Sequence, residues 1–210
     1  MLSKRSNEHD CSIQETKQMI IHTAQKLFMT YGYRSVSTRQ IAETCGVTQP
    51  ALYHHFQNKK TIYIEVVKSI MQRTKADLYH IKNHYSTFKD RLYQIAYYML
   101  MNHQEDLTQM FHDLQHEMDE DTQILIREWW LDSYLNPVVF IIEEAVHKEQ
   151  IRDLTAIGSN IMEIALFILD LMKSFLQSPA HRQLNDSKRR EEAERKAKLI
   201  VTIFLEGISG

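Results

Sequence analysis

The sequence predicts an all-α protein, and three observations support this. The chain has only five Gly and three Pro among 210 residues, whereas a β-rich or α/β chain uses many such residues in its turns. Long stretches contain neither residue, and their apolar positions recur every three or four residues, as on one face of a helix. The 43% content of hydrophobic residues is enough to bury a substantial core.

Composition also excludes several classes of protein. No run of about 18 apolar residues is present, so we expect no transmembrane helix. The N-terminus, MLSKRSNEHDCS, lacks the apolar core of a secretory signal. The two cysteines, Cys11 and Cys45, form neither a disulfide framework nor a metal-binding pattern. We therefore expect a cytoplasmic protein, since thiols stay reduced in that compartment.

A first helix is expected over residues 13–31, where the apolar residues share one helical face. These residues are Ile20, Ile21, Ala24, Leu27, Phe28 and Tyr31. Gly32 ends the helix, because glycine enters left-handed conformations without a Cβ clash. Residues 1–12 are polar and are expected to be disordered, like many free termini.

Two short helices joined by a tight turn are predicted over residues 38–59. Thr38 is the expected N-cap of the first of them, and Gly46 ends it. Thr48 caps the second helix, and Pro50 lies in its first turn, where a missing N–H costs nothing. This pattern, at about residues 37–56, is typical of a helix-turn-helix, whose second helix enters the DNA major groove. The alternative is a structural helical corner with a solvated outer face.

The residues from 13 to about 67 resemble the N-terminal domain of the tetracycline-repressor (TetR) family of bacterial transcription regulators. The matching positions include Ile20, Ala24, Leu27, Phe28, Tyr31-Gly32-Tyr33, Ser37-Thr38-Arg39-Gln40-Ile41-Ala42, Gly46-Val47, Leu52-Tyr53-His54-His55-Phe56 and Asn58-Lys59. Cys45 departs from the small residue that is commoner in the family, and we interpret it as a buried small hydrophobe. The resemblance implies a homodimer with a three-helix DNA-binding domain, residues 1–58, and a helical ligand-sensing and dimerisation domain, residues 59–210.

The resemblance also implies which side chains contact DNA. Arg39 and Gln49 are the expected base readers, which agrees with the ability of glutamine to hydrogen-bond base edges. The expected phosphate or backbone contacts are Thr38, Thr48, Tyr53, His55 and Lys59. Pro50, Ala51 and His54 are expected to line the groove-facing surface.

Charge is distributed unevenly along the chain. Residues 1–60 hold eight Lys or Arg against four Asp or Glu, a net charge of +4, whereas the whole chain carries −2. A basic N-terminal part on an acidic remainder fits a protein that meets phosphate at one end. The alternative interpretation of this charge excess is chance. For the N-terminal segment, the alternative to disorder is an arm that reaches DNA through Lys4 and Arg5.

The remaining chain is expected to be helical throughout. A long helix from about residue 58 or 59 to 85 leaves the first domain and enters the second. Further helices are expected at about 87–103, 106–118, 121–149, 155–177 and 187–207, with Pro137 kinking or splitting the third of these near Leu135. The last two are apolar enough to predict a homodimer built as a four-helix bundle, with burial within one chain as the alternative.

The middle helices are rich in Met and aromatic residues, which suit a pocket for a small apolar molecule. The candidate ligand-binding residues are Tyr97, Met101, Met110, Trp129, Trp130, Tyr134 and Phe140. Four acidic residues among them, Glu105, Asp113, Glu128 and Asp132, would favour a cation if they face the same space. Ordinary core packing is the alternative for each aromatic residue.

No catalytic pattern or cofactor motif is present, so we expect no enzyme and no cofactor. The pairs His112/His116 and His80/His84 have the i,i+4 spacing of metal ligands, but an ion shared by two imidazoles needs further ligands from elsewhere in the chain. Neither pair has the intervening Glu of an HExxH motif. The sequence therefore predicts a DNA-binding regulator, a repressor that a small apolar or cationic molecule releases from a palindromic operator. The alternatives are a regulator whose body binds a metal, haem or a protein, and a helical metal-binding protein with an incidental helix-turn-helix.

Overall fold

The computed structural model describes residues 2–102, 107–176 and 185–208, and over these residues it is helical without strands. The chain divides into two compact units, which we describe separately. The first comprises residues 1–70 and 106–126, and the second comprises residues 71–105 and 127–210. The all-α prediction is confirmed, and none of the described helices is long and apolar enough to cross a membrane. The predicted domain boundary at residue 58/59 stays a prediction.

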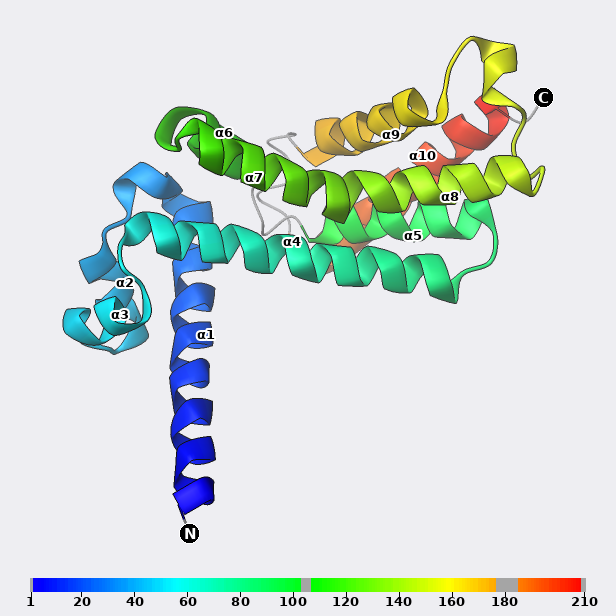
Figure 1. The fold of residues 1–210 in the computed structure, drawn as a ribbon. Helices are drawn as coiled ribbons and strands as arrows, with labels where there is room; N and C mark the ends of the chain where they lie inside the picture. The colour runs from blue at the N-terminus through cyan, green and yellow to red at the C-terminus, as the bar shows by residue number, and fades with distance from the viewer. Residues whose placement is uncertain (1, 103–106, 177–184, 209–210) are drawn as a thin grey trace. The chain divides into compact units, whose positions relative to one another are not determined.

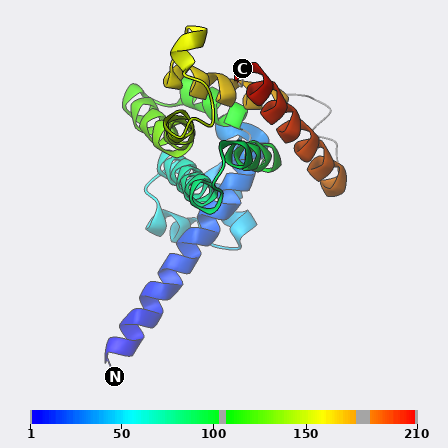
Figure 2. The same ribbon diagram turned by 90° about the vertical axis from the view of Figure 1, so that its right-hand side faces the viewer.

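The first unit begins with α1 (Leu2–Ser35), followed by α2 (Thr38–Cys45) and α3 (Gln49–His55). It continues with the start of α4 (Lys59–His84), α6 (Leu107–Glu117) and the start of α7 (Glu120–Trp130). Gly32 breaks the helical geometry of α1 with φ 79° and ψ 159°, as predicted. The N-terminal half of α1 extends past α2 and α3 in both views (Figures 1 and 2).

Residues 2–12 are helical, so the expected disorder of this segment is wrong. The segment contains neither Gly nor Pro and adjoins a helix that is anchored further along the chain. Extending an existing helix adds a hydrogen bond for each residue that is fixed, whereas starting a new helix is costly.

The core of the first unit joins α1 to the helix-turn-helix and to α4. Ile20, Phe28, Ile41, Leu52 and Ile62 are fully buried. The rings of Phe28, Tyr33 and Tyr63 contact one another with centroids 5.1–5.8 Å apart. These three rings join α1 to α4, whereas α2 and α3 contribute the buried side chains of Ile41 and Leu52 to the core.

The second unit contains the rest of α4, α5 (Phe88–Met101), the π-helical segment η1 (Leu131–Leu135) and α8 (Asn136–His147). The short 3₁₀ segment η2 (Leu154–Ile157), α9 (Ile161–Leu176) and α10 (Asp186–Ile208) complete it, with α10 packed mainly along α5. Pro137 follows η1 and lies in the first turn of α8. The predicted disturbance near Leu135 is therefore confirmed, and it takes the form of a π-helical turn rather than a break.

Candidate nucleic-acid interface

Local capping chemistry shapes the helix-turn-helix. Ser37, not Thr38, caps α2, because the Ser37 hydroxyl accepts the backbone N–H of Gln40 at 3.1 Å. Thr38 is the first residue of α2, so its prediction as a cap is wrong. Gly46 ends α2 in the left-handed conformation, with φ 71° and ψ 22°. Thr48 caps α3 as predicted, since its hydroxyl accepts the N–H of Ala51 at 3.3 Å.

The packed faces of α2 and α3 leave their outer faces to solvent. Ile41 and Leu52 are fully buried, whereas Cys45 is partly exposed rather than buried as expected. Every predicted DNA-contacting side chain is exposed or partly exposed: Thr38, Arg39, Thr48, Gln49, Pro50, Ala51, Tyr53, His54, His55 and Lys59. The first unit thus presents these residues on the surface of α2, α3 and the start of α4.

Three of these side chains share a hydrogen-bond network. The Gln49 amide Nε2 donates to the Thr38 Oγ1 at 3.3 Å. The same Thr38 oxygen lies 3.0 Å from the Tyr53 hydroxyl. Gln49 and Tyr53 are four residues apart, so they lie on one face of α3. One hydroxyl from α2 therefore connects an expected base reader with an expected phosphate contact.

Arg39 is held by a neighbour on its own helix. The Arg39 Nε donates to Glu43 Oε1 at 2.8 Å, and the two side chains are 78% and 64% exposed. Our sequence interpretation did not include Glu43, although its i,i+4 spacing from Arg39 indicates such a pair. The pair limits the conformations of Arg39 and places a negative charge beside the candidate interface.

His55 and Lys59 are partly exposed, as are Thr38 and Ala51. Burial, followed by the positive charges of His54 and Lys17, lowers the pKa of His55. The Lys59 ammonium lies 4.2 Å from the centre of the Tyr33 ring and donates to the Arg34 carbonyl at 3.4 Å. Burial lowers the pKa of Lys59, and this effect exceeds the opposite effect of the nearby carboxylates of Glu117 and Asp113, which raise the pKa. Lys59 must therefore leave these contacts, at least in part, to reach a phosphate.

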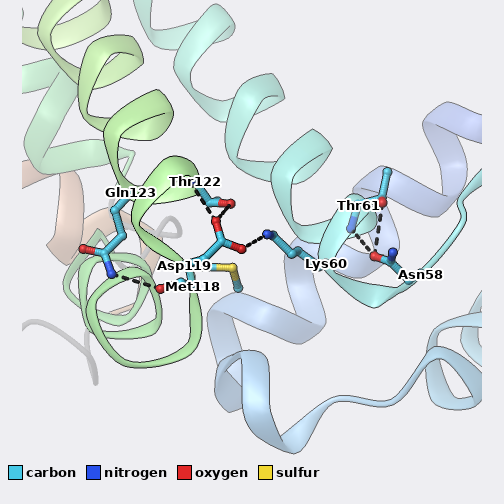
Figure 3. A network of polar contacts seen from close by, with 7 residues as sticks. All are labelled: Asn58, Lys60, Thr61, Met118, Asp119, Thr122 and Gln123. Carbon is cyan, nitrogen blue, oxygen red and sulfur yellow. Dashed lines mark hydrogen bonds and ion pairs between the residues drawn. The ribbon is translucent and has the colours of Figure 1, made fainter.

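A second polar network holds the start of α4 (Figure 3). The Asn58 side chain caps α4 by accepting the N–H of Thr61 at 2.9 Å. Lys60 forms an ion pair with Asp119, which also accepts the N–H of Thr122 at 3.0 Å. Asp119 thus caps α7 and contacts α4 at once, as the labelled side chains in Figure 3 show. The pKa of Asp119 is lowered chiefly by its hydrogen bond to Lys60.

Two of the four acidic residues expected near a ligand, Asp113 and Asp132, have other partners. Asp113 is buried and accepts the backbone N–H of Tyr33 at 2.8 Å. Asp132 forms an ion pair with Lys75 at 2.6 Å, and Glu128 is exposed. Glu105 lies outside the described residues. These contacts give Asp113 and Asp132 structural roles and weaken the argument for a cationic ligand.

Six of the seven candidate ligand-binding residues lie in the second unit, and Met110 lies in the first. Tyr134 is buried, and its hydroxyl lies 3.2 Å from the Thr74 Oγ1. The Trp130 ring stacks on Tyr134 with a centroid distance of 6.4 Å. Tyr97 stacks on Tyr93, whereas Phe140 is 39% exposed. The remaining two, Met101 and Trp129, are partly exposed.

Thr74 and Tyr98 form a polar centre that the sequence interpretation missed. The Tyr98 hydroxyl donates to Thr74 at 3.5 Å, next to the contact of Thr74 with Tyr134. Burial raises the pKa of both Tyr98 and Tyr134 to about 12, so both phenols are neutral at physiological pH. Thr74 is only 1% exposed. No residue pattern marks a lone threonine within a helix as part of such a centre.

The histidine pairs adopt the expected proximity. The rings of His112 and His116 have centroids 4.6 Å apart, and those of His80 and His84 are 5.5 Å apart. Within the described ranges, no group of three or more His, Cys, Asp or Glu has an arrangement that could hold a metal ion.

Comparison with known proteins identifies the helix-turn-helix part. Residues 20–66 match the family described as bacterial regulatory proteins, tetR family. Over 64 residues the chain is 33% identical to the HTH-type transcriptional repressor AcnR of Corynebacterium jeikeium, which covers 30% of this chain and 34% of that protein. In this relative and three others the match spans only 24–34% of the relative's length.

Solved structures extend the likeness over most of the chain. A putative fatty acid metabolism regulator of Clostridium perfringens matches with a TM-score of 0.69 and 22% identity, over 90% of this chain and 98% of that one. The regulator FadR from Bacillus subtilis, in complex with stearoyl-CoA, matches with a TM-score of 0.69 and 19% identity, over 88% and 97% of the two chains. At these identities the comparison shows a shared fold.

Proposed function

We propose that this chain, whose residues 20–66 match the tetR family of bacterial regulatory proteins, is a ligand-responsive transcriptional repressor. The proposed target is a palindromic operator, from which a small apolar or cationic molecule releases the protein. The observation that carries the proposal is the solvent-facing group of DNA-contacting candidates on α2 and α3. The net charge of +4 over residues 1–60 supports the same use.

The proposed mechanism is a shift between two arrangements of a dimer. One arrangement matches the spacing of two operator half-sites, about one helical turn apart. An effector that binds the other arrangement more tightly lowers DNA affinity, and DNA must then lower effector affinity by the same factor. Helices α4 and α7 each contribute to both compact units, and α4 is the connection that leads directly from the helix-turn-helix, so we expect this coupling to act through it.

DNA binding is tested by selection from a duplex library with a randomised central segment, using the purified full chain at moderate salt. We expect enrichment of one palindromic sequence, with binding that weakens as salt increases because phosphate contacts release counterions. Failure to enrich any sequence, with equal binding to all duplexes, would overturn the proposal.

The effector is proposed to bind in the second unit, near the buried phenol of Tyr134. The stack of Trp130 on Tyr134 supports an apolar wall, and the hydroxyls of Thr74 and Tyr98 supply polar atoms. Because a B. subtilis protein of the same fold was solved with stearoyl-CoA, a long acyl chain is the first probe, and tetraphenylphosphonium is the cationic one. A ligand raises the melting temperature of the state it binds and should weaken operator binding.

We also propose a homodimer through α9 and α10. Exposed apolar side chains on these helices support it, since contiguous apolar surfaces commonly mark protein contacts. These are Met162, Leu166, Phe167, Leu199 and Ile203, with exposed fractions of 39–57%. The ring of Phe167 contacts that of Phe204 at 5.8 Å, so part of the surface is continuous across the two helices.

A further inference from the structure

The hydroxyl of Thr38 is free of the capping role that the sequence suggested. Because Ser37 caps α2, the Thr38 side chain extends toward α3 and meets both Gln49 and Tyr53. A threonine hydroxyl has one donor and two acceptor positions, whereas an amide nitrogen only donates. The Gln49 Nε2 must therefore be the donor in its contact with Thr38, which turns the amide oxygen Oε1 away from Thr38.

The contact with Tyr53 links this orientation to phosphate binding. A phosphate oxygen accepts hydrogen bonds, so a Tyr53 hydroxyl that binds phosphate donates its only hydrogen bond to the phosphate. Its oxygen then accepts the Thr38 proton, and Thr38 in turn has only acceptor positions left for Gln49. In this arrangement Gln49 presents its Oε1 and one remaining N–H to the groove.

We propose that Thr38 is a positioning residue for base recognition, which orients the Gln49 amide when Tyr53 engages a phosphate. The inference rests on the proposed function and adds to it the identity of the base pair. An amide that offers one acceptor and one donor matches adenine, whose N6 donates and whose N7 accepts in the major groove. Gln49 therefore reads an A·T pair, and Thr38 determines how strictly it does so.

The test compares base preferences of full-length variants on one duplex library. Q49A defines the position that Gln49 reads, where preference for A·T should fall by about 5- to 140-fold. T38V, which replaces the hydroxyl by a methyl group of similar size, should lose a comparable part of the preference at that same position. T38S, which keeps the hydroxyl, should retain it, and the double variant T38V/Q49A should lose no more there than Q49A alone.

Each outcome decides the matter. A T38V protein that binds all duplexes more weakly but keeps its preference makes Thr38 a phosphate contact only and overturns the inference. A Q49A protein with unchanged preferences, or one whose lost preference is for another pair, overturns it as well. If T38V is misfolded by circular dichroism, T38A provides the same comparison. A wild-type protein that enriches no sequence overturns the proposed function itself, which separates the two failures.

Discussion

Lys60 in the first turn of α4 forms an ion pair with Asp119, the residue that caps α7, 59 residues further along the chain. The pair joins the end of the helix-turn-helix segment to the turn between α6 and α7, all within the first unit. Because α4 begins three residues after Phe56 of the helix-turn-helix, the contact restrains the base of the candidate DNA-binding surface.

The first prediction concerns the pH dependence of this contact. The hydrogen bond from Lys60, followed by those from Thr122, lowers the pKa of Asp119 in the folded state. A lowered folded-state pKa stabilises the protein above the unfolded pKa of about 3.9, and this contribution is lost as pH falls further. D119N should therefore melt at a lower temperature than wild type at pH 7, and the two should converge below about pH 4.

The matched control for this prediction is E120Q, which removes a negative charge from the next residue of the same helix start. Thermal melts of both variants across pH separate the specific pair from a general effect of charge at the α7 N-terminus. Equal behaviour of D119N and E120Q would contradict the assigned role of Asp119.

Capping chemistry explains why the helix-turn-helix was predictable. Gly46, Thr48 and Pro50 act through their own backbone or within three residues, so their effects are encoded locally. Ser37 and Thr38 are both hydroxyl residues at a helix start, and local sequence cannot choose between them. The choice depends on Gln49 and Tyr53, which reach Thr38 only after α2 and α3 have packed.

The contacts of the first unit show the limit of sequence reasoning. Asp113 accepts a hydrogen bond from Tyr33, 80 residues away, and nothing near either residue indicates the pairing. Met110 was grouped with aromatic residues by composition, but its carbonyl accepts a hydrogen bond from Tyr63 in the first unit. Composition identifies residues suited to a pocket, whereas the path of the chain decides which of them share a unit.

The second prediction separates phosphate contacts from base contacts. K59M should weaken binding to every duplex and reduce the slope of log affinity against log salt by about 1. Q49A should instead cost about 1–3 kcal/mol at one base pair. K89M, which removes an exposed charge from α5 in the second unit, is the control in fluorescence anisotropy titrations. Equal losses of K59M and Q49A on operator and random duplexes would refute the division of roles.

The third prediction is a pH dependence of DNA binding through His55. Its pKa is lowered in the free protein, chiefly by burial, and a phosphate nearby would raise it in the complex. The complex then binds more protons than the free protein, so affinity should increase as pH falls between the two pKa values, within about pH 8 to 5.

For each unit of difference between those two pKa values, the affinity for DNA can change by at most about tenfold. H55Q should flatten the profile measured by anisotropy at constant ionic strength. H22Q, which changes an exposed histidine of α1, should leave it unchanged. A wild-type affinity that is constant over this range would show that no phosphate approaches His55.

The fourth prediction tests the proposed dimer through Phe167, whose side chain is 57% exposed on α9. In an isologous interface each substitution occurs twice and meets its symmetric surroundings. F167E would bury two carboxylates in an apolar contact, a cost that dissociates the dimer. The variant should sediment as a monomer at concentrations where the wild type is dimeric, and it should lose most of its affinity for a two-half-site operator.

A suitable control is I124E, since Ile124 is 50% exposed but lies on α7 in the first unit. It introduces the same charge at a similarly exposed apolar position outside α9 and α10. The expected result is an unchanged sedimentation coefficient and unchanged binding for I124E, with both altered for F167E. If the F167E protein were still dimeric, the dimer interface would lie elsewhere than on this face of α9 and α10. A monomeric F167E protein that still binds a single half-site would show that the helix-turn-helix works without dimerisation, and that the dimer supplies the affinity for the palindrome.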